Sequence, residues 1–110
     1  MKILLLEDDI ILAEIISEYL IKNNFIVSIT YDGYETEQLI YSEQFDLLLL
    51  DINVPNISGL SIANKIRSNG LLMPIIFISS SICLDDFKKA YQYGANDFIR
   101  KPFSLEELLI

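Results

Sequence analysis

Two patterns of hydrophobic residues alternate along the chain. Short apolar runs of strand length are separated by longer segments in which apolar residues recur at helical spacing. The predicted strands cover residues 2–6, 25–30, 46–50, 73–79 and 96–99. The predicted helices cover residues 9–23, 34–42, 58–69 and 84–93, and a fifth begins at Ser104. Because the two kinds of element alternate through short connections, and the strands are apolar on both faces, we expect an α/β fold with a parallel sheet and helices on both sides.

The last predicted helix is short. Its sequence, SLEELLI, allows only about two turns, with Glu107 placed three residues after Ser104 as in a capping box. A chain of 110 residues suits a single domain, so residues 1–110 are expected to form one. Since the chain ends on apolar residues, we expect the last helix to be truncated and the chain to be part of a longer protein.

Composition and charge exclude several classes of function. The 16 acidic and 8 basic residues give a net charge of −8, which disfavours direct binding to nucleic acid. There is no histidine, which excludes Ser-His-Asp and Cys-His catalysis, zinc–histidine sites and a phosphohistidine on this chain. No apolar run is long enough to span a membrane. The single cysteine, Cys83, is typical of a reducing compartment, so we expect a cytoplasmic protein.

Chemically distinctive side chains follow the ends of several predicted strands. In strand order they are Glu7, Asp8 and Asp9, then Asp51, then Ser79, then Lys101. In open parallel sheets, ligands bind outside the carboxyl ends of the strands. Each residue alone has an ordinary structural explanation, such as a helix cap for Asp9 or a surface charge for Lys101. Their joint position at one edge of the sheet favours a functional site.

Asp51 ends the most apolar strand, LLLL, and three interpretations are open: a helix cap or turn residue, a metal ligand, or a nucleophile. Together with Glu7 and Asp8 it would form a crowded acidic cluster. Each like-charged pair at ~4 Å costs about 4 kcal/mol at an effective dielectric constant of roughly 20. One lysine cannot neutralise three carboxylates, whereas a divalent cation can. Oxygen ligands suit Mg²⁺, and Mn²⁺ would also fit.

A divalent cation would favour the interpretation of Asp51 as a nucleophile. The cation can bridge a carboxylate and an incoming phosphoryl group and spread the charge of the transition state. Asp51 would then form an aspartyl phosphate. Lys101 would be a second cation on the phosphoryl oxygens, and Ser79 would donate a hydrogen bond to another of these oxygens.

Four stretches of the chain together resemble the receiver domain of bacterial two-component response regulators. They are ILLLEDD, DLLLLDINVPNISGL, PIIFISS and GANDFIRKPFSLEEL, and the similarity covers essentially the whole chain. The resemblance implies a flavodoxin-like (CheY-like) doubly wound sheet of parallel strands in the order 2-1-3-4-5, with helices on both faces. It also implies that the domain is not an enzyme, except that it catalyses its own phosphorylation and dephosphorylation.

The resemblance assigns roles to the acidic end of the site. Asp51 matches the phosphoacceptor of the family. Asp8 matches the main acidic metal ligand, and Glu7 matches the second acid, which often acts through water. Asn53 stands where the family supplies a backbone carbonyl to Mg²⁺. Asp9 matches a third acid often present in the family, although capping of the first helix is the expected role for it.

The resemblance also assigns roles to three residues that follow the acids along the chain. Lys101 matches the lysine that contacts the phosphoryl group, and its bond to Pro102 matches one that is cis in the family, so we expect a cis bond here. Ser79 matches the hydroxyl residue that follows the fourth strand. Phe98 matches the aromatic residue that changes rotamer on activation, where tyrosine is commoner.

The implied function is a phosphorylation-dependent signalling switch. A sensor histidine kinase would phosphorylate Asp51, and the surface of the fourth helix, fifth strand and fifth helix would change to control an output. GANDF and FSLEEL are most similar to the OmpR/PhoB-type subfamily, in which a winged-helix DNA-binding domain follows the receiver. We therefore expect an effector domain after residue 110 and control of transcription. Homodimerisation through the same surface is expected, with candidate charges at Asp97, Glu107, and Lys88 or Lys89.

Two alternative functions stay open at this point. A haloacid-dehalogenase-like phosphatase would also use an aspartate nucleophile and Mg²⁺, but its DxDx[TV] pattern is not met, because the third position is Asn53. The chain also lacks room for a substrate cap. A stand-alone module or pseudo-receiver would bind partners without phosphorylation, and the complete set of Asp8, Asp51, Ser79 and Lys101 argues against it.

Overall fold

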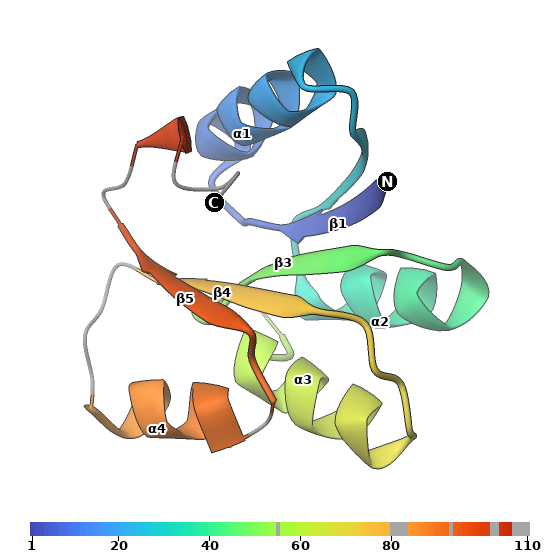
Figure 1. The fold of residues 1–110 in the computed structure, drawn as a ribbon. Coiled ribbons are helices and arrows are strands. Elements are labelled where there is room, and N and C mark those ends of the chain that lie inside the picture. The colour runs from blue at the N-terminus through green and yellow to red at the C-terminus, as the bar shows by residue number, and fades with distance from the viewer. Residues whose placement is uncertain (55, 80–83, 93, 102–103, 107–110) are drawn as a thin grey trace.

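The computed structural model describes residues 1–54, 56–79, 84–92, 94–101 and 104–106. The described residues form a sheet of five strands: β1 (Lys2–Leu6), β2 (Ile26–Thr30), β3 (Leu47–Asp51), β4 (Ile75–Ser79) and β5 (Asp97–Arg100). All neighbouring strands are parallel, and their order is β2-β1-β3-β4-β5. Figure 1 labels four of these strands, β1, β3, β4 and β5. The predicted fold class and strand order are therefore confirmed.

Helices cover both faces of the sheet (Figure 1). On one face, α1 (Ile10–Lys22) packs over a core that we call the α1-side core, which consists of Ile3, Leu5, Ala13, Ile16, Leu20, Leu49, Ile78 and Ile99. On the other face lie α2 (Gly33–Ser42), α3 (Gly59–Ser68) and α4 (Leu84–Gln92). Their core, the α3-side core, consists of Leu4, Leu6, Ile40, Phe45, Leu48, Leu50, Ile52, Leu60, Ile62, Ala63, Ile66, Ile75, Phe77 and Ala90.

Three helices begin at a polar residue whose side chain caps the first turn. Asp9 accepts a hydrogen bond from the amide of Leu12 (3.2 Å), which confirms its expected capping role. Asp32 caps α2, so this helix begins at Gly33, one residue earlier than predicted. Ser58 caps α3. A capping side chain satisfies a backbone N–H that has no partner within the helix, and it thereby fixes where the loop from each strand ends.

The other boundaries agree with the sequence prediction to within one or two residues. β4 begins at Ile75 and not at residue 73, and β5 ends at Arg100. At the start of the last predicted helix, Leu105 and Glu106 lie in a 3₁₀ turn. Glu107 and Ile110 lie outside the described residues, as does Pro102 with the expected cis bond. No helix in the described part of the chain is both long and apolar enough to cross a membrane.

Candidate functional site: an acidic cluster at the carboxyl ends of the strands

The parallel register brings the carboxyl ends of the central strands to one edge of the sheet. Leu6 of β1 lies level with Leu50 of β3, and Asp51 lies level with Ile78 of β4. Side chains alternate between the two faces of a strand. Three candidate side chains therefore lie on the α1 side of the sheet, since the residues two positions before Glu7, Asp51 and Lys101 all belong to the α1-side core (Leu5, Leu49 and Ile99).

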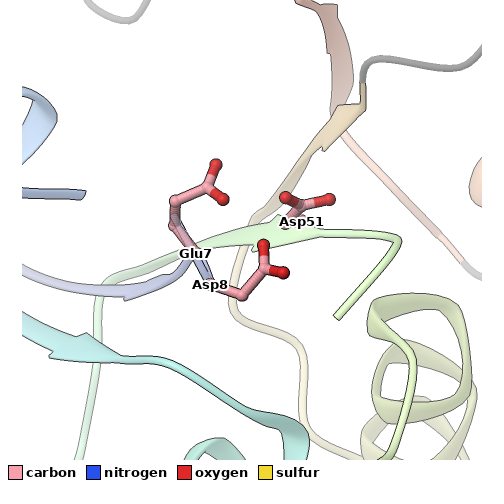
Figure 2. Close-up of side chains that lie close together, drawn as sticks. All are labelled: Glu7, Asp8 and Asp51. Carbon is pink, nitrogen blue, oxygen red and sulfur yellow. The ribbon is translucent and has the colours of Figure 1, made fainter. Parts of the chain in front are cut away.

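Glu7, Asp8 and Asp51 form a cluster of carboxylates at this edge. One oxygen from each residue lies within 4.8 Å of the others, and Figure 2 shows the three side chains converging. Glu7 is 0% exposed and Asp51 is 3% exposed, whereas Asp8 is open to solvent. Two buried carboxylates beside a third one are costly unless cations neutralise them.

Lys101 supplies one positive charge to this cluster. Its Nζ lies 3.0 Å from Oδ2 of Asp51 and 2.6 Å from Oε1 of Glu7. Burial alone would lower the pKa of Lys101, but the interactions with Glu7 and Asp51 outweigh it, so the pKa is raised and the side chain is an ammonium ion near neutral pH. The backbone amide of Lys101 donates to the carbonyl of Ser79 (2.8 Å), which holds the end of β5 against the end of β4.

Glu7 is the most perturbed acid of the cluster. Its pKa is raised to about 7, mainly by burial and also by the neighbouring Asp51, although the ammonium group of Lys101 and the amide of Asp9 act in the opposite direction. Its Oε1 forms the ion pair with Lys101, yet it accepts no hydrogen bond of good geometry from any described residue. A second cation would therefore find a buried carboxylate oxygen available beside two further carboxylates, which are the ligands that Mg²⁺ prefers.

The loop after β3 holds the carboxylate of Asp51 in place. The amide of Asn53 donates to Oδ1 of Asp51 (3.0 Å), and the amide of Gly59 donates to the carbonyl of Ile52 (3.2 Å). A Cβ atom on Gly59 would lie only 2.4 Å from the carbonyl oxygen of Asp51, so the first turn of α3 approaches β3 more closely than any side chain allows. Sequence reasoning missed this role of Gly59, although a glycine directly after the helix cap Ser58 was a signal for it.

The remaining predicted residues lie around the cluster. Ser79 ends β4 and is fully buried. Its neighbour Ile78 belongs to the α1-side core, so strand alternation directs Ser79 towards the opposite face. Phe98 is half-buried and packs against the α3-side core, and thus lies on the other face of the sheet from Glu7 and Asp51. The side chain of Asn53 is exposed.

The candidate dimer charges divide into two groups. Asp97, Lys88 and Lys89 are exposed, on β5 and α4. Glu107 lies outside the described residues. Exposed positions are compatible with a role in dimerisation. The homodimer itself stays a prediction.

Comparison with protein families gives one match over almost the whole chain. The profile of the response regulator receiver domain matches residues 3–110. Among curated proteins, the response regulator ArlR of Staphylococcus saprophyticus is 44% identical over 108 residues, which cover 98% of this chain and 49% of that protein. The transcriptional regulatory protein TctD of Salmonella typhimurium is 36% identical over 108 residues, which cover 98% of this chain and 48% of that protein. The chain thus spans about half the length of these relatives.

Solved structures share the fold. The beryllofluoride-activated N-terminal receiver domain of RstA from Klebsiella pneumoniae superposes with a TM-score of 0.91 at 30% identity, covering 99% of this chain and 92% of that one. The receiver domain of the Francisella response regulator 1452 superposes with a TM-score of 0.93 at 27% identity, covering 98% of this chain and 89% of that one.

Proposed function

Because the chain belongs to the response regulator receiver domain family, we propose that it is a phosphorylation-dependent switch in which Asp51 accepts a phosphoryl group from a sensor histidine kinase. Receiver domains are signalling domains that interact with sensor kinases. One observation carries the proposal for this chain. Both oxygens of the buried Asp51 carboxylate are held, Oδ1 by the amide of Asn53 and Oδ2 by Lys101, and oxygens of Glu7 and Asp8 lie close by.

The chemistry of the transfer is a displacement at phosphorus. An oxygen of Asp51 forms the new O–P bond while the P–N bond of a phosphohistidine breaks, and the imidazole leaves with the bonding electron pair and takes up a proton from solvent. Lys101 moves from its position between Glu7 and Asp51 onto the phosphoryl oxygens, where its charge stabilises the transition state. The amide of Asn53 keeps the carboxylate oriented throughout.

The acidic cluster fits a divalent cation. Glu7, Asp8, Asp51 and the backbone carbonyl of Asn53 would hold Mg²⁺, or Mn²⁺ in its place. When bound, the ion neutralises the cluster and the charge that develops on the phosphoryl group. Without it, the incoming phosphoryl group would meet an excess of negative charge at this edge, because Lys101 alone faces three carboxylates.

The signal would leave the site through β4 and β5. Phosphorylation adds a charge of about −2 and strong hydrogen-bond acceptors at Asp51. Ser79, which ends the neighbouring strand, turns its hydroxyl towards the phosphoryl group. Phe98 then changes rotamer and fills the space that the Ser79 side chain leaves. The surface formed by α4, β5 and the segment from Ser104 changes as a result. Ser79 is fully buried and Phe98 is packed against the α3-side core, so neither can move without its neighbours.

The output of the switch is proposed to be transcription. Curated relatives are transcriptional regulators about twice as long as the matched region, so an effector domain that binds DNA would follow residue 110. With its net charge of −8, the chain itself is a poor ligand for nucleic acid. A homodimer through the α4–β5 surface would bring two such domains to neighbouring half-sites on DNA.

The test is the intact mass of the protein after incubation with acetyl phosphate and Mg²⁺. We expect wild type to gain the mass of one phosphoryl group, and Asp51→Asn to gain none. Asp46→Asn is the matched control, because it removes an exposed carboxylate that directly precedes the same strand, at the end opposite to Asp51, and it should be phosphorylated like wild type. Phosphorylation of Asp51→Asn at the wild-type level would remove Asp51 from its role.

The same samples separate the two alternative functions. A phosphatase would release many equivalents of phosphate from a phosphomonoester, whereas the proposed switch takes up one phosphoryl group. A pseudo-receiver would show no response to beryllofluoride with Mg²⁺, which together imitate the phosphoryl group. A wild-type protein that gains no mass and does not respond to beryllofluoride would favour the pseudo-receiver.

A further inference from the structure

Arg67 joins three segments of the chain at a place far from the acidic cluster. It lies in the last turn of α3. Its Nη1 donates to the carbonyl of Leu71 (2.9 Å) and its Nη2 donates to the carbonyl of Gly94 (3.0 Å). Burial lowers the pKa of the guanidinium, and none of the ion pairs between described residues involves it. Its hydrogen bonds therefore go to backbone, where the planar fork of arginine can bind two carbonyls at once.

Gly94 is the glycine of the turn that ends α4. Its φ is +81°, and its amide donates to the carbonyl of Tyr91 (3.0 Å), while the amide of Ala95 donates to the carbonyl of Ala90 (3.1 Å). This pair of bonds is the Schellman arrangement of a helix end. A Cβ atom on residue 94 would lie 2.9 Å from Nε of Arg67. Glycine is therefore needed for the backbone conformation and for the close approach of Arg67.

Both carbonyls bound by Arg67 precede strands of the sheet. Leu71 leads into β4, and the turn at Gly94 leads into β5. Just beyond the turn, Asn96 pairs with Ile75 at the start of β4: its amide donates to the carbonyl of Ile75 (2.8 Å), and its Oδ1 accepts from the amide of Ile75 (3.1 Å). Arg67 thus holds the amino ends of β4 and β5, at the edge of the sheet opposite to Asp51.

We propose that Arg67 is a positioning residue that fixes the α4–β5 turn against α3, so that movements of α4 and β5 are confined to their parts nearer Asp51. The second half of this inference rests on the proposed function. Hydrogen bonds from a charged donor are stronger than those between neutral groups, and here one of them binds the turn at Gly94 while the other binds the segment at Leu71. With this end fixed, a change at Ser79 or Lys101 reaches the surface as a tilt of α4 and β5, and the turn at Gly94 stays in place.

The first experiment tests the anchoring role without any phosphoryl mimic. Hydrogen exchange of individual amides is measured by NMR for wild type, Arg67→Ala and Arg67→Lys. We expect the amides of Gly94 and Ala95 to exchange roughly tenfold faster or more in Arg67→Ala, because local opening becomes easier, while the amides of β1 keep their wild-type rates. Arg67→Lys should be intermediate, since an ammonium lacks the planar fork. Lys65→Ala is the matched control, because Lys65 lies on α3 but pairs with Glu37 of α2.

Two outcomes would overturn the anchoring role. Unchanged exchange at Gly94 and Ala95 in Arg67→Ala would show that the hydrogen bond from Arg67 does not hold the turn in place. Equal acceleration of every amide, β1 included, would show that Arg67 contributes to global stability alone.

The second experiment adds beryllofluoride and Mg²⁺. In wild type we expect changes in chemical shift around Asp51 and Phe98, with exchange at Gly94 and Ala95 unchanged. In Arg67→Ala the mimic should change the chemical shifts and the exchange rates of Gly94 and Ala95 as well. Equal responses at Phe98 and at the turn in wild type would overturn the confinement of the movement. If the mimic perturbs nothing around Asp51, the proposed function fails, whereas the anchoring role is still decided by the first experiment.

Discussion

Two lysines at opposite edges of the sheet each lie beside two acidic residues, but in different surroundings. At the carboxyl edge, Nζ of Lys101 lies between Glu7 (2.6 Å) and Asp51 (3.0 Å), and the Glu7 side chain is 0% exposed. At the amino edge, Nζ of Lys2 lies 2.5 Å from Glu43, whose side chain is 39% exposed. Asp46 there binds the backbone amide of Lys2 and not its ammonium group.

The difference between the two edges separates an exposed ion pair from a buried one. Water screens the charges of Lys2 and Glu43, and the ammonium group of Lys2 also lies over the ring of Phe45, with Nζ 5.0 Å from the ring centroid. At the other edge, burial raises the pKa of Glu7 to about 7, so the fold keeps a carboxylate where an apolar residue would stabilise it more. Acids with perturbed pKa values cluster at functional sites.

The largest expected effect comes from removing the buried lysine. Lys101→Met leaves Glu7 and Asp51 without their cation, which should destabilise the protein by about 3–5 kcal/mol and slow phosphorylation by acetyl phosphate by roughly a hundredfold or more. Lys2→Met is the matched control and should change stability by no more than about 1 kcal/mol. Urea unfolding and the initial rate of phosphorylation measure the two effects. Equal losses of stability in the two variants would contradict the distinction between the edges.

The next effect concerns the buried acid and has the opposite sign. The pKa of Glu7 is about 7 in the folded protein and has an ordinary value of 4.5. Between these pH values the folded protein holds a proton on Glu7 that the unfolded chain has released. The contribution of Glu7 to the free energy of unfolding is therefore fully present below pH 4.5, and it is lost as the pH rises through 7. Glu7→Gln removes this loss. Without metal and at about pH 8, the variant should be more stable than wild type by up to ~3 kcal/mol.

Urea unfolding of both proteins in a chelator across this pH range is the measurement. The difference between Glu7→Gln and wild type should vanish towards acid pH and grow above neutrality. Added Mg²⁺ should stabilise wild type more than the variant, because the variant lacks one of the carboxylates. A variant that is less stable than wild type at every pH would show that ionised Glu7 contributes net stability through Lys101.

A third prediction concerns the approach of α3 to Asp51. In Gly59→Ala the new Cβ atom would lie 2.4 Å from the carbonyl oxygen of Asp51, which should cost about 1–3 kcal/mol and also slow phosphorylation, since the end of β3 must shift. Gly70→Ala is the control. Gly70 has a φ of +80° and open space around it, so alanine there costs about 1–2 kcal/mol of backbone strain and should leave the phosphorylation rate unchanged.

The two edges also show how far the sequence could predict the structure. The apolar run that ends at Asp51 and the alternation of strands with helices were sufficient to place the candidate residues at one edge, because parallel connectivity leaves few other arrangements. The sequence predicted the capping role of Asp9, but it did not distinguish the burial of Glu7 from that of Asp8, whereas in the structure Glu7 is buried and Asp8 is exposed. Strand alternation from Leu5 was a signal for the burial of Glu7.

Other features depend on contacts that no local pattern encodes. The contact of Gly59 with the backbone of Asp51 follows from how closely α3 packs on β3. The hydrogen bond from Arg67 to Gly94 joins residues far apart in the chain. Sequence patterns report periodicity within an element, and these contacts arise only when elements are placed beside one another.

The smallest expected effect is the strength of the exposed ion pair itself. A double-mutant cycle of Lys2→Met and Glu43→Gln should give a coupling energy of no more than about 1 kcal/mol, and about 1 M salt should remove most of it. The corresponding cycle of Lys101→Met and Glu7→Gln should give a larger coupling that salt hardly changes, because buried charges are screened much less. The change of the coupling energy with salt distinguishes the two pairs more sharply than its size does, since it does not require either variant to keep its full stability. If the Lys2–Glu43 coupling were as large and as insensitive to salt as the buried one, exposure would not explain the difference between the edges.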